Sequence, residues 1–116
     1  MKVVYVAGPY RSKEGINGIC KNIDAAKQVS RELWGMGLAV VCPHTNSALM
    51  DGPDLDDSVF LDGDLEILAR CDAIIMIANW ESSSGACNER EFAIQEGLEV
   101  FAWESDRGAI IEFARS

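Results

Sequence analysis

The sequence predicts a single α/β domain, in which a four-stranded parallel sheet lies between two layers of helices. Short apolar segments alternate along the chain with longer segments whose apolar residues recur at helical spacing. This strand-helix alternation, repeated four times, is typical of parallel sheets joined by right-handed crossovers. The chain has 116 residues, which is room for only one hydrophobic core. We therefore expect residues 1–116 to form one domain.

Four apolar runs predict the strands. Each run is short, is rich in β-branched or other apolar residues, and ends near a glycine, a proline or a polar turn. The predicted strands are residues 3–7, 38–42, 72–78 and 98–103. For four strands linked in this way we expect the order 2-1-3-4, as in a flavodoxin-like or Rossmann-like three-layer sandwich.

The segments between the strands predict the helices. Apolar residues recur at helical spacing from Ile19 to Leu33, and Gly35 and Gly37 then offer the helix its end. Further helices are predicted over residues 58–70, 86–96 and 108–114. Residues 44–57 hold turn residues with weak periodicity, so they predict a long loop over the sheet of the kind that often binds a ligand.

The charge balance and the cysteine pattern exclude several classes of function. Lys and Arg number 10 and Asp and Glu number 19, which gives a net charge of −9. Nucleic acid polymers and anionic membranes select clustered basic residues, so we expect neither as a partner.

No apolar run resembles a signal peptide or a membrane span, so we expect a cytoplasmic protein. The four cysteines form no CxxC pair, so we expect reduced thiols and no bound metal.

The expected strand order places a ligand crevice at the carboxyl ends of the first and third strands. Two loops meet there, and their candidate binding residues are Gly8, Pro9, Tyr10 and Arg11 in the first loop and Ser83, Ser84 and Gly85 in the second. The second loop begins a helix, where free N–H groups and the helix dipole favour an anion. Plain N-capping explains these serines equally well. No dinucleotide or P-loop fingerprint occurs, and we expect no cofactor.

Two carboxylates lie on helix faces that should be buried. On a helical wheel, Asp64 falls in the middle of an apolar arc formed by Phe60, Leu61, Leu65, Ile67, Leu68 and Cys71. An ionised carboxylate facing a core is costly unless it is hydrogen-bonded or functional, although Asp64 could instead cap a neighbouring loop. Glu89 lies about one turn into its helix, where it can reach the crevice or simply complement the helix dipole. Two such carboxylates at one crevice suit acid, base and nucleophile chemistry at an acetal-like carbon.

Three motifs, in this order and spacing, resemble the nucleoside 2-deoxyribosyltransferase superfamily, which includes the 2'-deoxynucleoside 5'-phosphate N-hydrolases. The motifs are YVAGPYR from Tyr5 to Arg11, Asp64 placed eight residues before Asp72, and SSGACNE from Ser83 to Glu89. The chain is also similar to a group of small proteins that carry YxAGPY and CDAxxxxxxW. The resemblance implies a homodimer or a larger homo-oligomer.

The resemblance also implies roles for single residues. Glu89 takes the position of the nucleophile that attacks C1' of the sugar, Asp64 that of the acid that assists the departing base, and Tyr5 that of the tyrosine that holds the nucleophile. Gly8, Pro9 and Arg11 match the first substrate loop. Ser83 matches a serine beside the 5'-phosphate in nucleotide hydrolases. His44 could contact phosphate or sugar, and Trp80 could stack on a base or cover the crevice, while a structural role is open for both.

These expectations combine into one leading hypothesis and one alternative. The leading hypothesis is cleavage of the N-glycosidic bond of a 2'-deoxynucleoside 5'-monophosphate, by hydrolysis or by deoxyribosyl transfer to a second base. The alternative is a non-catalytic nucleotide-binding or sensor module that uses the same crevice. In both, the partner is a small nucleotide or nucleoside, and the residues alone do not name the base.

Overall fold

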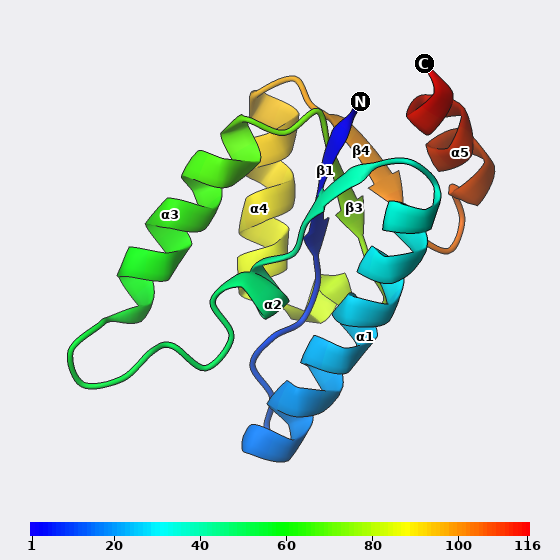
Figure 1. Ribbon diagram of the computed structural model, residues 1–116. Coiled ribbons are helices and arrows are strands. Elements are labelled where there is room, and N and C mark those ends of the chain that lie inside the picture. The colour runs from blue at the N-terminus through cyan, green and yellow to red at the C-terminus, as the bar shows by residue number, and fades with distance from the viewer.

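The predicted strand order is confirmed. The structure, a computed structural model, describes residues 1–116 and contains one four-stranded sheet in the order β2-β1-β3-β4 (Figure 1). All neighbouring strands pair in parallel. The strands are β1 (Val3–Ala7), β2 (Ala39–Val41), β3 (Ala73–Met76) and β4 (Glu99–Ala102). The register aligns Val4 of β1 with Val40 of β2 and with Ala73 of β3.

Helices cover both faces of the sheet, as the alternating pattern predicts. One face carries α1 (Ile16–Gly35) and α5 (Arg107–Arg115), and the other carries α3 (Asp57–Ala69) and α4 (Ser84–Gln95) (Figure 1). Two short elements lie at the carboxyl ends of strands: α2 (Pro43–Asn46) follows β2, and the 3-10 helix η1 (Trp80–Ser82) follows β3. The chain is therefore a three-layer sandwich.

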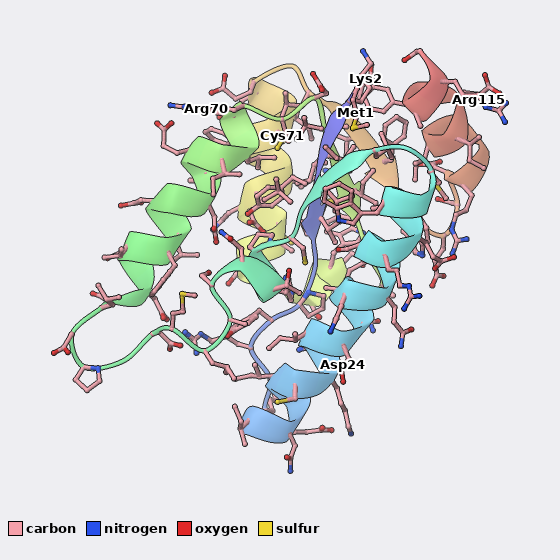
Figure 2. The ribbon with its side chains drawn as sticks, viewed as in Figure 1. Met1, Lys2, Asp24, Arg70, Cys71 and Arg115 are labelled. Atoms are coloured by element: carbon pink, nitrogen blue, oxygen red, sulfur yellow. The ribbon has the colours of Figure 1, made fainter.

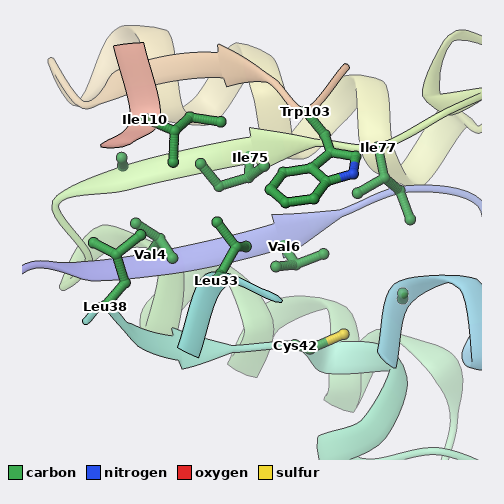
Figure 3. Packing of buried hydrophobic residues seen from close by; sticks show 11 residues of the cluster. Val4, Val6, Leu33, Leu38, Cys42, Ile75, Ile77, Trp103 and Ile110 are labelled. Carbon is green, nitrogen blue, oxygen red and sulfur yellow. The ribbon is translucent and has the colours of Figure 1, made fainter. Parts of the chain in front are cut away.

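Alternation along the central strands divides the core into two clusters. Successive side chains of a strand point to opposite faces. Val4 and Val6 of β1 accordingly pack with α1 and α5, whereas Tyr5 and Ala7 pack with α3 and α4. Figure 3 shows the first cluster, in which Leu33 of α1 and Ile110 of α5 meet the sheet from one side. Both central strands are buried on both faces, which explains their near-continuous apolar sequences.

The structure differs from the sequence-based expectations at two loops and one side chain. The long loop predicted over residues 44–57 contains α2, because Pro43 stands at its first position, where a missing N–H costs nothing. The 3-10 helix η1 occupies part of the loop before α4. Leu61, expected on the buried arc of its helix, is 54% exposed, because the first turns of α3 border an open cavity instead of the sheet.

The two ends of the sheet have different surroundings. Lys2, Arg70 and Cys71 lie at the end of the molecule where the strands begin (Figure 2). The Lys2 ammonium lies 5.4 Å from the ring centroid of Phe113 in α5. The opposite end, where the strands finish, holds the loops that the sequence predicts to bind a ligand. No helix combines the length and the apolar character that a membrane crossing requires.

Candidate active site

A cavity of about 540 Å³ lies at the carboxyl ends of β1 and β2 and beside the N-terminus of α4. Ten of the residues that the sequence singles out line it: Gly8, Pro9, Tyr10, Arg11, His44, Asp64, Ser83, Ser84, Gly85 and Glu89. They come from four separate segments, so the fold brings together residues that are distant in sequence. The cavity lies where open α/β sheets bind their ligands.

Tyr5 and Glu89 form a hydrogen-bonded pair beside this cavity. Tyr5 is fully buried in β1, and its hydroxyl donates a hydrogen bond to Oε2 of Glu89 in α4. The helix α4 packs against β1 and β3, so the second turn of the helix projects Glu89 over the end of β1. One carboxylate oxygen is thus fixed by Tyr5, while Glu89 also lines the open cavity. Glu89 is therefore both held by a hydrogen bond inside the protein and part of the cavity wall.

The protonation equilibria of the two inward carboxylates lie close to neutral pH. Burial raises the pKa of Glu89 to about 7; the Tyr5 hydrogen bond opposes this rise and the nearby charge of Asp64 adds to it. Burial likewise raises the pKa of Asp64 to about 6. The pKa of Tyr5 is also raised, first by burial and then by Glu89, so its hydroxyl keeps its proton and remains a donor. Carboxyl groups tuned in this way are suited to acid, base and nucleophile roles.

The N-terminus of α4 presents polar backbone to the cavity. The Ser83 hydroxyl oxygen accepts a hydrogen bond from the N–H of Ala86 at 3.1 Å, so the N-cap interpretation is confirmed. The cap leaves the first-turn N–H groups of Ser84 and Gly85 without an intrahelical acceptor. Both residues line the cavity. The site therefore combines a capped helix with donors that favour an anionic group.

Arg11 is held in ion pairs at the rim of the cavity. Its guanidinium lies 2.5 Å from Oδ1 of Asp57 and 3.4 Å from Oδ2 of Asp51. These contacts connect the loop after β1 to the segment that leads into α3. Sequence reasoning missed Asp51 and Asp57, because both lie in a polar stretch with many acids and no periodic signal to distinguish them. An anion that binds Arg11 has to compete with these two carboxylates.

His44 is buried in the wall of the cavity. Its Nε2 lies 2.6 Å from the carbonyl oxygen of Pro9, and its ring meets the ring of Tyr10 edge-on at a centroid distance of 5.5 Å. Burial lowers the pKa of His44 and so favours the neutral ring. The short helix α2 therefore brings His44 against the loop that follows β1.

Trp80 and Tyr5 are the two candidate residues that do not line the cavity, and of these only Trp80 makes no side-chain hydrogen bond to a lining residue. Trp80 packs against the apolar cluster beneath α4. The Arg90 guanidinium covers its ring at 5.2 Å from the centroid.

All four cysteines are free, and Cys42 and Cys71 are buried while Cys20 is exposed. No group of three or more His, Cys, Asp or Glu side chains is placed to hold a metal ion.

Comparison with solved structures defines the class of fold. The chain is similar to a 2-deoxyribosyltransferase from the psychrotolerant bacterium Bacillus psychrosaccharolyticus, with a TM-score of 0.61 and 23% identity over 86% of this chain and 70% of that one. It is also similar to a 2-deoxyribosyltransferase from Leishmania mexicana, with a TM-score of 0.60 and 20% identity over 88% of this chain and 63% of that one. The resemblance to deoxyribosyltransferases is thus confirmed for the α/β fold, and the chain spans less than two thirds of the Leishmania enzyme.

The family follows from the sequence model that matches residues 2–102. The chain belongs to the family described as a domain of unknown function, DUF4406. Among curated proteins, none matches the sequence. The family itself therefore assigns no reaction, and the function has to be argued from the cavity.

Proposed function

We propose that the protein cleaves the N-glycosidic bond of a 2'-deoxynucleoside 5'-monophosphate, with Glu89 as the nucleophile. The observation that carries this proposal is the half-buried Glu89 carboxylate, which is hydrogen-bonded by the Tyr5 hydroxyl and lines the same cavity as Asp64. A nucleophile and a proton donor at one cavity are the two groups that cleavage at an acetal-like carbon requires. The likeness to deoxyribosyltransferase structures adds support from the fold.

The chemistry proceeds in two steps. Glu89 in its ionised form attacks C1' of the sugar, the bond from C1' to the base nitrogen breaks, and protonated Asp64 gives its proton to the departing base. Water, or the N–H group of a second base, then attacks C1' and gives its proton to the ionised Asp64, while the bond from C1' to Glu89 breaks and frees the carboxylate. The raised pKa values, about 6 for Asp64 and about 7 for Glu89, let both groups titrate near neutral pH. The reactive state, with the proton on Asp64 and Glu89 ionised, is the less populated of the two singly protonated states.

The 5'-phosphate is assigned to the N-terminus of α4. Ser84 and Gly85, in the first turn of the helix, line the cavity, and their N–H groups have no intrahelical acceptor. The Ser83 hydroxyl still has its own hydrogen to donate after accepting from Ala86. The rim is acidic, since Asp51 and Asp57 already neutralise Arg11. The helix terminus is therefore the stronger anion site, and Arg11 contributes only if it leaves its ion pairs.

The test is release of free base. The protein is incubated with each of the four 2'-deoxynucleoside 5'-monophosphates and with the matching nucleosides, and the products are separated by chromatography. We expect base release from at least one monophosphate, and a loss of roughly a thousandfold or more for Glu89→Gln, because the amide cannot act as a nucleophile. Addition of a second free base distinguishes transfer from hydrolysis.

A matched control comes from Glu91, which lies in the same helix but is exposed. Glu91→Gln removes the same charge outside the cavity and is expected to keep full activity. No base release from any substrate, or equal activity of wild type and Glu89→Gln, contradicts the proposal. Stabilisation by a nucleotide in a thermal-shift assay without any release would instead support the sensor module.

A further inference from the structure

Phe60 is a phenylalanine that the hydrophobic core does not use. The chain has four phenylalanines, and the other three, Phe92, Phe101 and Phe113, each pack against one of the two core clusters. Phe60 belongs to neither cluster, and part of its surface is exposed. Aromatic side chains gain much from burial, so a ring that stays outside the core is one that a bound molecule can cover with benefit.

Phe60 lines the cavity beside Asp64. Both residues lie in α3, four positions apart, so they share one face of the helix and are separated by about one turn. The two leucines of the cavity wall, Leu61 and Leu65, come from the same helix, whereas residues 82–85, three serines and a glycine, form the wall at the N-terminus of α4. The cavity therefore has an apolar wall on α3 and a polar wall at α4.

Tyr10 also brings an aromatic ring to the cavity wall, but that ring already has partners in the protein. The His44 ring meets it edge-on at a centroid distance of 5.5 Å, and the Arg11 guanidinium lies 5.9 Å from its centroid. The Tyr10 hydroxyl oxygen accepts a hydrogen bond from the N–H of Leu49 at 3.0 Å. Phe60 takes part in no aromatic pair and no cation–π contact. Of the two rings, Phe60 is therefore the one that no aromatic or cationic side chain covers.

We propose that Phe60 determines base specificity by stacking on the base of the bound nucleotide, and that it favours purines over pyrimidines. The inference rests on the proposed function in taking a nucleotide as the ligand. The polar wall takes the phosphate, so the base lies at the apolar wall, about one helical turn from Asp64, the proposed proton donor. A purine has two fused rings and covers more of an aromatic side chain than a single pyrimidine ring does, which gives the preference its direction.

The test is binding of the four 2'-deoxynucleoside 5'-monophosphates, measured by calorimetric titration in the Glu89→Gln background, where turnover does not interfere. We expect the purine nucleotides to bind more tightly than the pyrimidine nucleotides when Phe60 is present. Phe60→Ala is expected to weaken binding of the purine nucleotides by about tenfold or more, the usual size of a lost base–aromatic stack, and binding of the pyrimidine nucleotides by less. Phe60→Tyr keeps the ring and is expected to keep the purine preference.

Val59 provides the matched control, since it precedes Phe60 in α3 but is 52% exposed and does not line the cavity. Val59→Ala is expected to leave all four affinities unchanged. The inference is overturned if Phe60→Ala changes no affinity, if it weakens purine and pyrimidine nucleotides equally, or if none of the four nucleotides binds. An equal loss would indicate a general structural role for the side chain.

A second measurement holds even if Phe60→Ala does not fold. In Glu89→Gln protein labelled with ¹³C in its phenylalanine rings, the Phe60 signal is the one that Phe60→Tyr removes. A saturating purine nucleotide is expected to shift this signal upfield, because the stacked base adds its ring current, and an unmoved signal contradicts the inference. Purine-selective binding through Phe60 without base release contradicts only the proposed function. Base release that Phe60→Ala leaves unchanged in rate and in purine preference contradicts only this inference.

Discussion

Glu89 is a side chain that the fold holds in an unfavourable environment. Its carboxyl group is partly buried at the cavity wall, and the Tyr5 hydroxyl is its one hydrogen-bond donor within the protein. Burial disfavours the charged form of a carboxyl group. Residues in such positions often serve function at the expense of stability. This leads to two predictions about single residues.

The first prediction concerns stability against pH. The pKa of Glu89 is about 7 in the folded state against an ordinary value of 4.5, so between these values the folded protein binds more protons than the unfolded chain. Stability therefore falls as pH rises through this window, by up to about 3 kcal/mol. Glu89→Gln removes this loss and is expected to be more stable than wild type at pH 8, with the difference narrowing towards pH 4.5. Urea unfolding at several pH values measures it, and a wild type that is equally stable at pH 8 contradicts the prediction.

The second prediction concerns the two neighbours of Glu89, which act on its pKa in opposite directions. The Tyr5 hydrogen bond lowers that pKa, and the negative charge of Asp64 raises it. Tyr5→Phe is therefore expected to raise the pKa of Glu89 further, and Asp64→Asn to lower it. Carbon-13 NMR titration of the Glu89 carboxyl measures both shifts without any need for turnover. Shifts of the same sign in both variants would show that the neighbours do not act as described.

At the scale of elements, close packing at the end of β1 positions the loop that follows this strand. A Cβ placed on Gly8 would lie 2.3 Å from Cγ1 of Ile77, a core residue that follows β3. No larger residue fits there unless Ile77 moves. The glycine therefore has a structural reason to be present, in addition to its place in the cavity wall.

The corresponding prediction compares two glycines. Gly8→Ala is expected to destabilise the fold by about 1–3 kcal/mol, because the added methyl group overpacks the core. Gly63 lies inside α3 with nothing near its Cβ position, so Gly63→Ala is expected to stabilise the protein by up to about 1 kcal/mol. Thermal unfolding of both variants is the measurement. Equal stability of wild type and Gly8→Ala would mean that Ile77 yields freely.

Strands and long helices could be predicted because their signals are local. In the segments around Val4 and Ile75, successive residues are apolar without alternation. This pattern is typical of a central parallel strand, because both faces of such a strand are buried. The short helix α2 and the Arg11 ion pairs could not be predicted in this way. The helix α2 is only four residues long and rests on the packing of His44, and the partners of Arg11 lie 40 and 46 residues away in a stretch without periodicity. Such contacts depend on the three-dimensional arrangement of loops.

At the scale of the whole molecule, the cavity is built from loops that only the strand order brings together. Asp64 and Glu89 were singled out by their positions on helical wheels, and the fold places both at one cavity. The direction of the Trp80 side chain could not be predicted from the sequence, because a position in the loop after β3 does not determine which way the indole points. The indole packs inward, beneath Arg90.

The expected homodimer or larger homo-oligomer stays a prediction at this scale. Large apolar side chains are exposed along the segment that borders the cavity: Leu49, Met50, Leu55, Val59 and Leu61. Apolar groups gathered on one exposed segment favour association. Sedimentation velocity at micromolar concentration is expected to show a species larger than the 12.7 kDa monomer. A monomer across the accessible concentration range would contradict this expectation.

The most direct test of the central claim, that Glu89 attacks C1', is a crystal structure of the Glu89→Gln variant with a bound 2'-deoxynucleoside 5'-monophosphate. The predicted result is a ligand in the cavity whose C1' lies within about 3–3.5 Å of the residue 89 side chain, the range from which bound groups react. A ligand bound with C1' beyond reach of residue 89, or a cavity that stays empty at saturating nucleotide, would contradict it.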